Sequence, residues 1–238
     1  MLILGIETAV EHVSVALADH RGILATSLLA SDRRHAESLT PMIQFVCAQA
    51  SINTTELDAI AVDAGPGLFT GMRVGIATAQ SMAWALDIPV IPVCSLDILA
   101  QRVTRCDDMI AAALDARRGE VYWALFRPAS ETSPIVQRLT EPVVTVPEEL
   151  AALLNERAQE VVCVGSGIER YKSRIEFVST AQYAGPAYSQ PNAEELLTIA
   201  AQRAIREEWV SACDVKAMYL RVPDAEINWA TRQTVQEN

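Results

Sequence analysis

The chain has 238 residues, of which 50% are hydrophobic and 21% are charged, which is enough to bury one large core or two small ones. Its formal net charge of −11 disfavours binding of nucleic acid or anionic lipid by the chain alone, because a surface that binds phosphates is basic. The five cysteines are scattered without a CxxC pair, and no run approaches the roughly 20 apolar residues of a membrane span, so we expect a reduced, cytoplasmic protein.

The first hundred residues predict a mixed sheet with helices on its faces. The opening residues, MLILGIETAV, lack the basic region of a signal peptide and are expected to form a strand. Alternating apolar residues at Val13, Val15 and Leu17 indicate a second strand. Three antiparallel strands are then followed by alternating helices and strands, an order typical of such a sheet. Strands are expected at 2–8, 13–19, 22–30, 57–65 and 88–95, and helices at 35–50 and 72–86.

The second half of the chain repeats the pattern of the first. ILGIETAVEHVSVAL (3–17) and AAALDARRGEVYWAL (111–125) align without a gap, and the alignment places Glu7 opposite Asp115. A strand-like PVVTV, a helix from Pro147 and a strand EVVCVGSG follow. The sequence therefore predicts an α/β fold with two copies of one βββαβα unit. We expect a first lobe at 1–105 and a second, smaller lobe at 106–238, whose helical run at 192–210 packs back on the first.

A glycine-rich stretch, GPGLFTGMRVG (65–75), joins a predicted strand to a predicted helix. It fits neither the phosphate-binding pattern GxxxxGK[ST] nor the dinucleotide pattern GxGxxG. We interpret it as a tight turn in which Pro66 fixes φ and Gly67 permits a positive φ, with binding of an anion as the alternative.

Small residues recur every four positions on the helix that follows this turn, and such spacing lets another helix approach closely. Apolar residues of the 35–50 helix can complete the patch. We expect this patch to bind a partner and, without a partner, to pair with itself in a homodimer; the alternative is packing on the chain's own sheet. The residues assigned to the patch are Leu39, Met42, Ile43, Val46, Gly71, Gly75, Ala79 and Ala83.

Each repeated hairpin has an acid at the end of its first strand, followed by a tight turn, which matches the layout of the ATPase lobes of actin, sugar kinases and Hsp70. In those proteins the two turns clamp phosphates and the acids organise Mg²⁺. Here the first turn carries Glu11 where phosphate would sit, and like charges repel. Glu7, Thr8 and Asp115 are therefore interpreted as parts of degenerate phosphate turns. We assign no catalytic, cofactor-binding or metal-ligating residue.

Nearly the whole chain resembles the TsaB (YeaZ) family, through ILGIETAVEHVSVAL, RRHAESLTPMI, GPGLFTGMRVGIATAQSMAWAL, LDARRGEVYWALF, VGSG and MYLR in this order. The resemblance implies two actin-like, RNase H-like lobes of the ASKHA fold. It also implies a non-catalytic scaffold that activates TsaD, the subunit that transfers a threonylcarbamoyl group to tRNA, with TsaE as the associated ATPase. ATP and metal are then expected on the partner subunits, and tRNA is expected to be bound only through the complex.

Two catalytic alternatives remain. The first is an active small-molecule kinase or ATPase of the same fold, which tight binding of Mg-ATP would reveal. The second is a metallopeptidase, which the sequence disfavours because Ser95 and Leu99 stand where TsaD has two metal-binding histidines. The three histidines, His12, His20 and His35, form no HExxH or HxxxH pair, and His35 is expected at the start of a helix.

Overall fold

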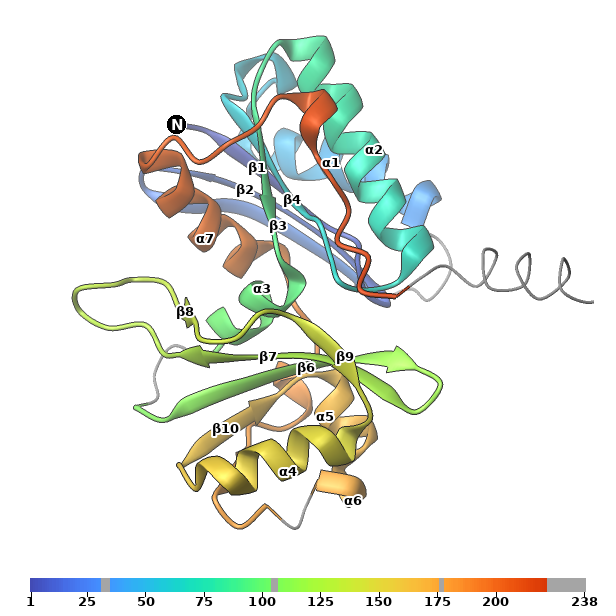
Figure 1. The fold of residues 1–238 in the computed structure, drawn as a ribbon. Helices are drawn as coiled ribbons and strands as arrows, with labels where there is room; N and C mark the ends of the chain where they lie inside the picture. Colours follow the sequence, from blue (N-terminus) through green and yellow to red (C-terminus); the bar gives the residue numbers. More distant parts are fainter. Residues whose placement is uncertain (31–34, 104–106, 176–177, 222–238) are drawn as a thin grey trace, which may run out of the picture.

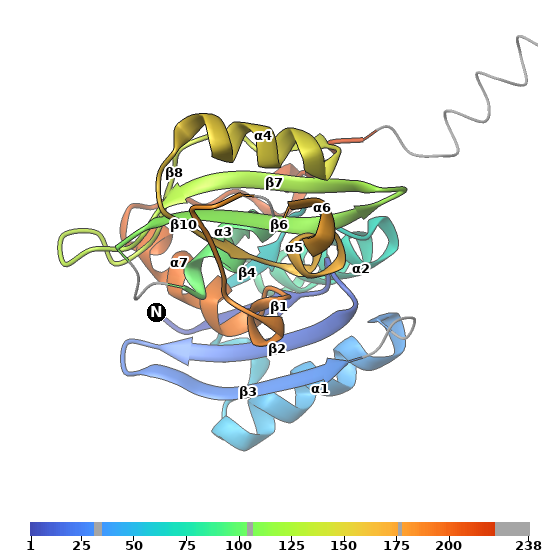
Figure 2. The same cartoon turned by 90° about the horizontal axis from the view of Figure 1, so that it is seen from below.

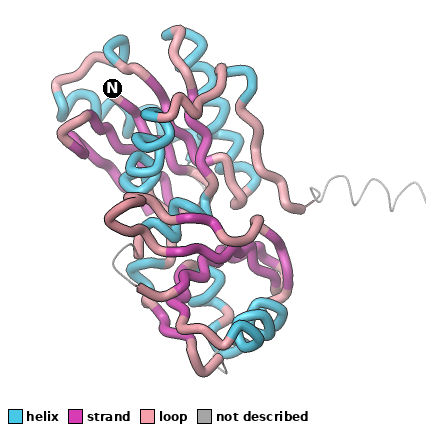
Figure 3. Tube along the Cα trace, turned by 60° about the vertical axis from the view of Figure 1, so that its left-hand side comes forward, coloured by secondary structure: helices cyan, strands magenta, loops and turns pink. Residues whose placement is uncertain are grey.

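Two lobes, each built around one β-sheet, make up the molecule (Figures 1 and 3). The computed structural model describes residues 1–30, 35–103, 107–175 and 178–221. The predicted boundary between residues 105 and 106 lies outside the described residues. No helix within these ranges is both long and apolar enough to cross a membrane.

The first sheet is mixed, as predicted. Its strands are β1 (Ile3–Glu7), β2 (His12–Asp19), β3 (Gly22–Ala30), β4 (Ala59–Asp63) and β5 (Val90–Val93), in the order β3-β2-β1-β4-β5. β2 is antiparallel to both β1 and β3, whereas β1, β4 and β5 are parallel. The predicted order of strands and helices in this lobe is confirmed.

The second sheet repeats the order of the first and confirms the predicted duplication. Its strands are β6 (Met109–Arg117), β7 (Glu120–Arg127), β8 (Gln137–Arg138), β9 (Val143–Thr145), β10 (Val161–Val164) and β11 (Ala181–Tyr183), in the order β11-β10-β6-β7-β8, with β9 also pairing with β7. β6 therefore occupies the position of β1, and β7 that of β2. The aligned acids, Glu7 and Asp115, lie near the ends of these equivalent strands.

Helices cover both faces of the sheets. They are α1 (His35–Ala50), α2 (Phe69–Leu86), α3 (Ser95–Gln101), α4 (Pro147–Arg157), α5 (Ser166–Arg170), α6 (Lys172–Ile175) and α7 (Ala193–Ile205). Because side chains alternate along a strand, Leu4 and Ile6 face α1 and α2, whereas Ile3 faces α7. In Figure 2, α1 and α4 lie at opposite ends of the molecule, and α3 and α7 lie between the two sheets.

The last part of the described chain returns to the first lobe. Asn192 caps α7 by accepting hydrogen bonds from two backbone N–H groups of the first turn, and α7 packs on the first sheet. Val210 then pairs with Val90, and the Met218 N–H donates to the Ala64 carbonyl at 2.7 Å. Residues 193–218 therefore complete the first lobe, although they follow the second lobe in sequence.

The small-residue row of α2 packs on the chain's own sheet. A Cβ atom at Gly71 would overlap the Thr8 carbonyl oxygen, and one at Gly75 would overlap the Thr8 hydroxyl. As a docking surface the predicted set is wrong, because all eight of its residues are buried inside the first lobe: Leu39, Met42, Ile43, Val46, Gly71, Gly75, Ala79 and Ala83. The small residues let α2 approach β1 and β4 instead of a second protein.

The Gly-Pro-Gly turn differs in detail from its predicted form. Gly65, not Gly67, has the positive φ, at 100°. Gly67 is needed for a different reason: a Cβ atom there would overlap the carbonyl oxygen of Ala9. The turn therefore packs directly on the loop that joins β1 to β2, and the Leu68 N–H donates to the Ala9 carbonyl at 2.6 Å.

Candidate functional site

The two repeated hairpins meet in a cleft between the lobes. Its cavity has a volume of about 100 Å³, and the residues that line it include Val10 and Glu11 from the first hairpin and Asp115 and Arg117 from the second. Pockets that hold small-molecule ligands and cofactors are typically ~300–1,000 Å³. This cavity alone is therefore smaller than a typical nucleotide pocket, and a second cavity of about 390 Å³ adjoins it and shares Asp115 and Arg117.

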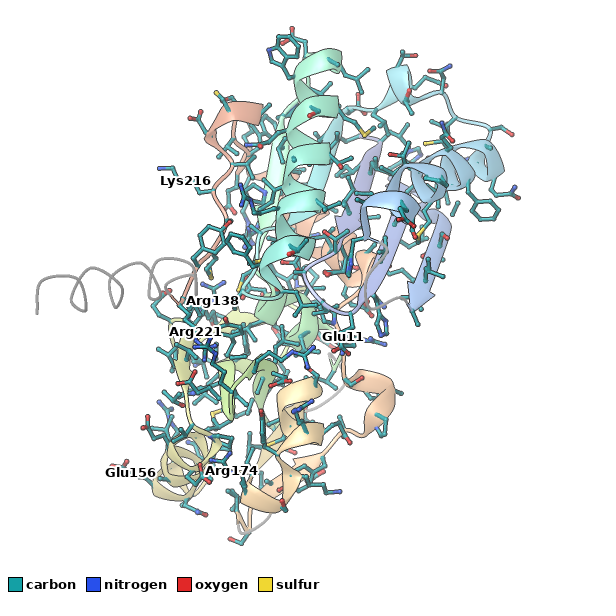
Figure 4. All side chains as sticks on the ribbon, turned by 90° about the vertical axis from the view of Figure 1, so that its right-hand side faces the viewer. Glu11, Arg138, Glu156, Arg174, Lys216 and Arg221 are labelled. Atoms are coloured by element: carbon teal, nitrogen blue, oxygen red, sulfur yellow. The ribbon has the colours of Figure 1, made fainter. Side chains whose placement is uncertain are left out.

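An ion pair spans the cleft. Arg117 is bonded through its guanidinium to the carboxylate of Glu11, and Figure 4 shows Glu11 where the lobes meet. The left-handed backbone at Arg117 (φ 63°) and Gly119 (φ 82°) shapes the turn that carries this arginine. Sequence reasoning identified Glu11 as a group that repels phosphate, but it missed Arg117 as its partner.

Asp115, the acid of the second copy, is occupied by neighbouring donors. Its Oδ1 accepts hydrogen bonds from the Arg117 N–H at 2.9 Å and from the Tyr171 hydroxyl at 3.0 Å. Its Oδ2 lies 3.4 Å from both Arg117 Nη1 and Arg170 Nε. The carboxylate is therefore neutralised by groups of its own lobe.

Glu7 and Thr8, the residues assigned to the first degenerate turn, do not line the cleft. Both are fully buried in the first lobe. The Thr8 hydroxyl donates to the Gly71 carbonyl at 2.8 Å, and Glu7 Oε1 accepts from the Ala9 N–H at 2.6 Å. The two copies thus differ: the acid of the second copy faces the cleft, whereas that of the first points into a core.

The position equivalent to the paired histidines of TsaD has no metal-binding side chains. Ser95 and Leu99 lie one turn apart on α3 and are fully buried. Ser95 donates its hydroxyl hydrogen to Asp63 at 2.6 Å, and Leu99 packs in the apolar layer beneath the second sheet. Within the ranges that the structure covers, no three histidine, cysteine or acidic side chains gather as metal ligands.

The outward faces of α1 and α2 carry exposed apolar side chains among polar ones. The two helices pack side by side on the first sheet. Trp84 is 83% exposed and Phe45 is 51% exposed, which is unusual for aromatic side chains. A second row of small, exposed residues on α2, Ala77, Ser81 and Ala85, lies beside the buried row. A groove of about 540 Å³, lined in part by Trp84 and Trp209, lies at the end of α2.

Comparisons with known proteins point to threonylcarbamoyladenosine biosynthesis. Residues 22–229 match the family model described as TsaD: tRNA N6-adenosine threonylcarbamoyltransferase. The chain is 32% identical to the Escherichia coli tRNA threonylcarbamoyladenosine biosynthesis protein TsaB over 93% of this chain and 95% of the relative. It is 28% identical to the Bacillus subtilis protein of the same name over 98% and 100%.

A solved structure agrees in fold along nearly its whole length. YeaZ from Pseudomonas aeruginosa superposes with a TM-score of 0.82 at 33% identity, over 92% of this chain and 99% of that one. This agreement and the repeated sheets give the chain the predicted actin-like, two-lobed ASKHA fold. The chain belongs to the TsaB (YeaZ) family of tRNA threonylcarbamoyladenosine biosynthesis proteins.

Proposed function

We propose that the chain is a non-catalytic subunit that binds and activates TsaD and works with the ATPase TsaE in the threonylcarbamoyl modification of tRNA. The observation that carries the proposal is the ion pair between Glu11 and Arg117, which spans the cleft. A nucleotide would have to break this pair, and its phosphates would then face the Glu11 carboxylate. ATP and metal accordingly belong on the partner subunits.

The docking surface in this proposal is the exposed face of α1 and α2. Ala77, Ser81 and Ala85 permit the close approach of a partner helix, and Phe45 and Trp84 supply aromatic anchors of the kind that dominate binding energy. This surface replaces the eight buried residues that the sequence suggested. Without TsaD, the same surface pairs with itself in a two-fold homodimer.

The isolated chain is expected not to hydrolyse ATP. The acid of the first copy is buried, and that of the second is neutralised by Arg117 and Arg170. Release of phosphate from Mg-ATP should equal that of a buffer blank, both for the wild type and for Asp115→Asn. Turnover by the wild type that Asp115→Asn abolishes would show an active ATPase and contradict the proposal.

The chain alone is also expected not to bind tRNA at physiological salt, because its net charge of −11 opposes the approach of phosphates. A mobility-shift titration with tRNA tests this, first with the chain and then with the chain and TsaD together. Salt-sensitive, micromolar binding by the chain alone would reveal a basic surface and make direct contact with tRNA part of its role.

A further inference from the structure

Two carboxyl groups lie side by side in the core of the first lobe. Glu7 ends β1 and Asp63 ends β4, and these strands are parallel neighbours in which Ile6 pairs with Val62. The two acids therefore occupy the next position of the register. Both side chains are fully buried.

Each carboxyl group uses one oxygen to hold a backbone turn. Glu7 Oε1 accepts from the Ala9 N–H at 2.6 Å. Asp63 Oδ1 accepts from the Gly65 N–H at 2.7 Å and from the Ser95 hydroxyl at 2.6 Å. The second oxygens, Glu7 Oε2 and Asp63 Oδ2, are shielded from solvent and receive no hydrogen bond from an N–H or O–H group of the described residues.

Two negative charges in contact at a fully buried site would be strongly destabilising. A single proton removes one charge and supplies the missing donor. We propose that Glu7 and Asp63 form a buried proton site, in which Glu7 keeps its proton at neutral pH and donates it from Oε2 to Asp63 Oδ2. Asp63 is the charged partner, because two hydrogen bonds to its Oδ1 stabilise the carboxylate.

The surroundings favour this arrangement. Burial, and then the Asp63 charge, raise the pKa of Glu7 well above its usual value. Burial also raises the pKa of Asp63, while the bonds from Glu7, Ser95 and Gly65 oppose that rise. On α3, Asp97 adds a like charge near Asp63, but Arg138 and Arg203 pair with it.

Among the described residues, the other elements around Glu7 bring no counter-ion to the pair. Ser14 of β2 lies opposite Glu7 and accepts from the Ala193 N–H at the start of α7. α2 presents Gly71 and Gly75 to the end of β1. On α1, the ring of His35 is bonded to the Val10 carbonyl at 2.7 Å.

The proton site joins the two loops that form the first-lobe wall of the cleft. Glu7 holds the loop at Ala9, and Asp63 holds the turn at Gly65. These loops also meet directly, through the bond from Leu68 to Ala9. Loss of the proton would place two like charges between them and push the loops apart.

Glu7→Gln tests the proposal, because the amide oxygen can still accept from Ala9 while the amide nitrogen donates permanently to Asp63. Folded wild type holds a proton that the unfolded chain releases above a pH of ~4.3, the ordinary pKa of glutamate. Wild-type stability should therefore fall relative to Glu7→Gln as pH rises, by up to tenfold in the folding equilibrium per pH unit until the raised pKa is reached.

Thermal melts of both full-length proteins between pH 5 and pH 9 measure this difference. We expect similar melting temperatures at pH 5 and a growing advantage of Glu7→Gln above it. Glu11→Gln, which removes a half-exposed carboxylate paired with Arg117, is the matched control and should follow the wild-type pH dependence. Curves for wild type and Glu7→Gln that run parallel over the whole range would overturn the proposal.

Infrared spectroscopy gives a test that does not depend on how well the variant folds. The wild type at pH 7 should show the carbonyl stretch of a protonated carboxylic acid, and this band should shift in D₂O. The band should persist in Glu11→Gln and disappear in Glu7→Gln. A wild-type spectrum at pH 7 without a protonated-acid band would show both groups ionised and overturn the proposal.

Discussion

Replacing Ala79 by leucine is expected to lower the melting temperature by several degrees, whereas replacing Ala77 by leucine should leave it nearly unchanged. Ala79 is fully buried between α2 and the first sheet, and Ala77, two residues away on the same helix, is exposed. Overpacking a core typically costs ~1–3 kcal/mol. In a chain of this size each kcal/mol shifts the melting temperature by ~2–4 °C.

Thermal melts of the two variants beside the wild type check this prediction, since the pair differs only in the face of α2 that receives the leucine. Equal melting temperatures for all three proteins would mean that the Gly71–Ala83 row does not pack on the sheet. The sequence-based docking surface would then have to be restored.

Replacing Ala77 by arginine is expected to weaken binding of TsaD by roughly ten- to a hundredfold, the affinity equivalent of ~1.4–3 kcal/mol. The arginine adds bulk and charge where the proposed partner helix approaches most closely. Because Ala77 is exposed in the isolated chain, the variant should melt like wild type. Calorimetric titration with TsaD measures the affinity.

Ala152→Arg is the matched control, because it places the same change on the exposed face of α4 in the second lobe. It should bind TsaD like wild type. Unchanged affinity for both variants would remove the α1–α2 face as the docking surface, and equal losses for both would indicate a general effect of charge.

Elements with strong periodicity could be predicted from the sequence. The helix expected at 35–50 is observed as His35–Ala50, because its apolar residues follow one stripe. The two hairpins were identified from their aligned acids and alternating residues, and the sheets share one strand order. Local patterns fix such elements, since each depends on residues close together in the chain.

The inward face of α2 could not be predicted in the same way. The helix carries two rows of small residues, one through Gly71 and Ala79 and the other through Ala77 and Ser81, and neither row is marked by charge. The row that contains the glycines faces the sheet, because only glycine fits against the Thr8 carbonyl oxygen and hydroxyl. Tertiary packing therefore decides which row stays exposed.

Only one partner of the ion pair in the cleft could be predicted from the sequence, for a related reason. Glu11 could be recognised within its turn, but its partner Arg117 lies 106 positions away and meets it only in the folded arrangement of the two lobes. The pairing of Glu7 with Asp63 likewise depends on the parallel register of β1 and β4. A signal was present for this second pair, since Glu7 and Asp63 each end a buried strand.

Formation of threonylcarbamoyladenosine by the reconstituted components tests the central claim most directly. TsaD, TsaE, tRNA and a threonylcarbamoyl donor are combined with no chain, with wild-type chain, or with the double variant Glu11→Gln/Asp115→Asn, and the modified nucleoside is measured. We predict little product without the chain and equal product with wild type and double variant. Full product without the chain, or its loss with a double variant that still binds TsaD, would contradict a non-catalytic activating role.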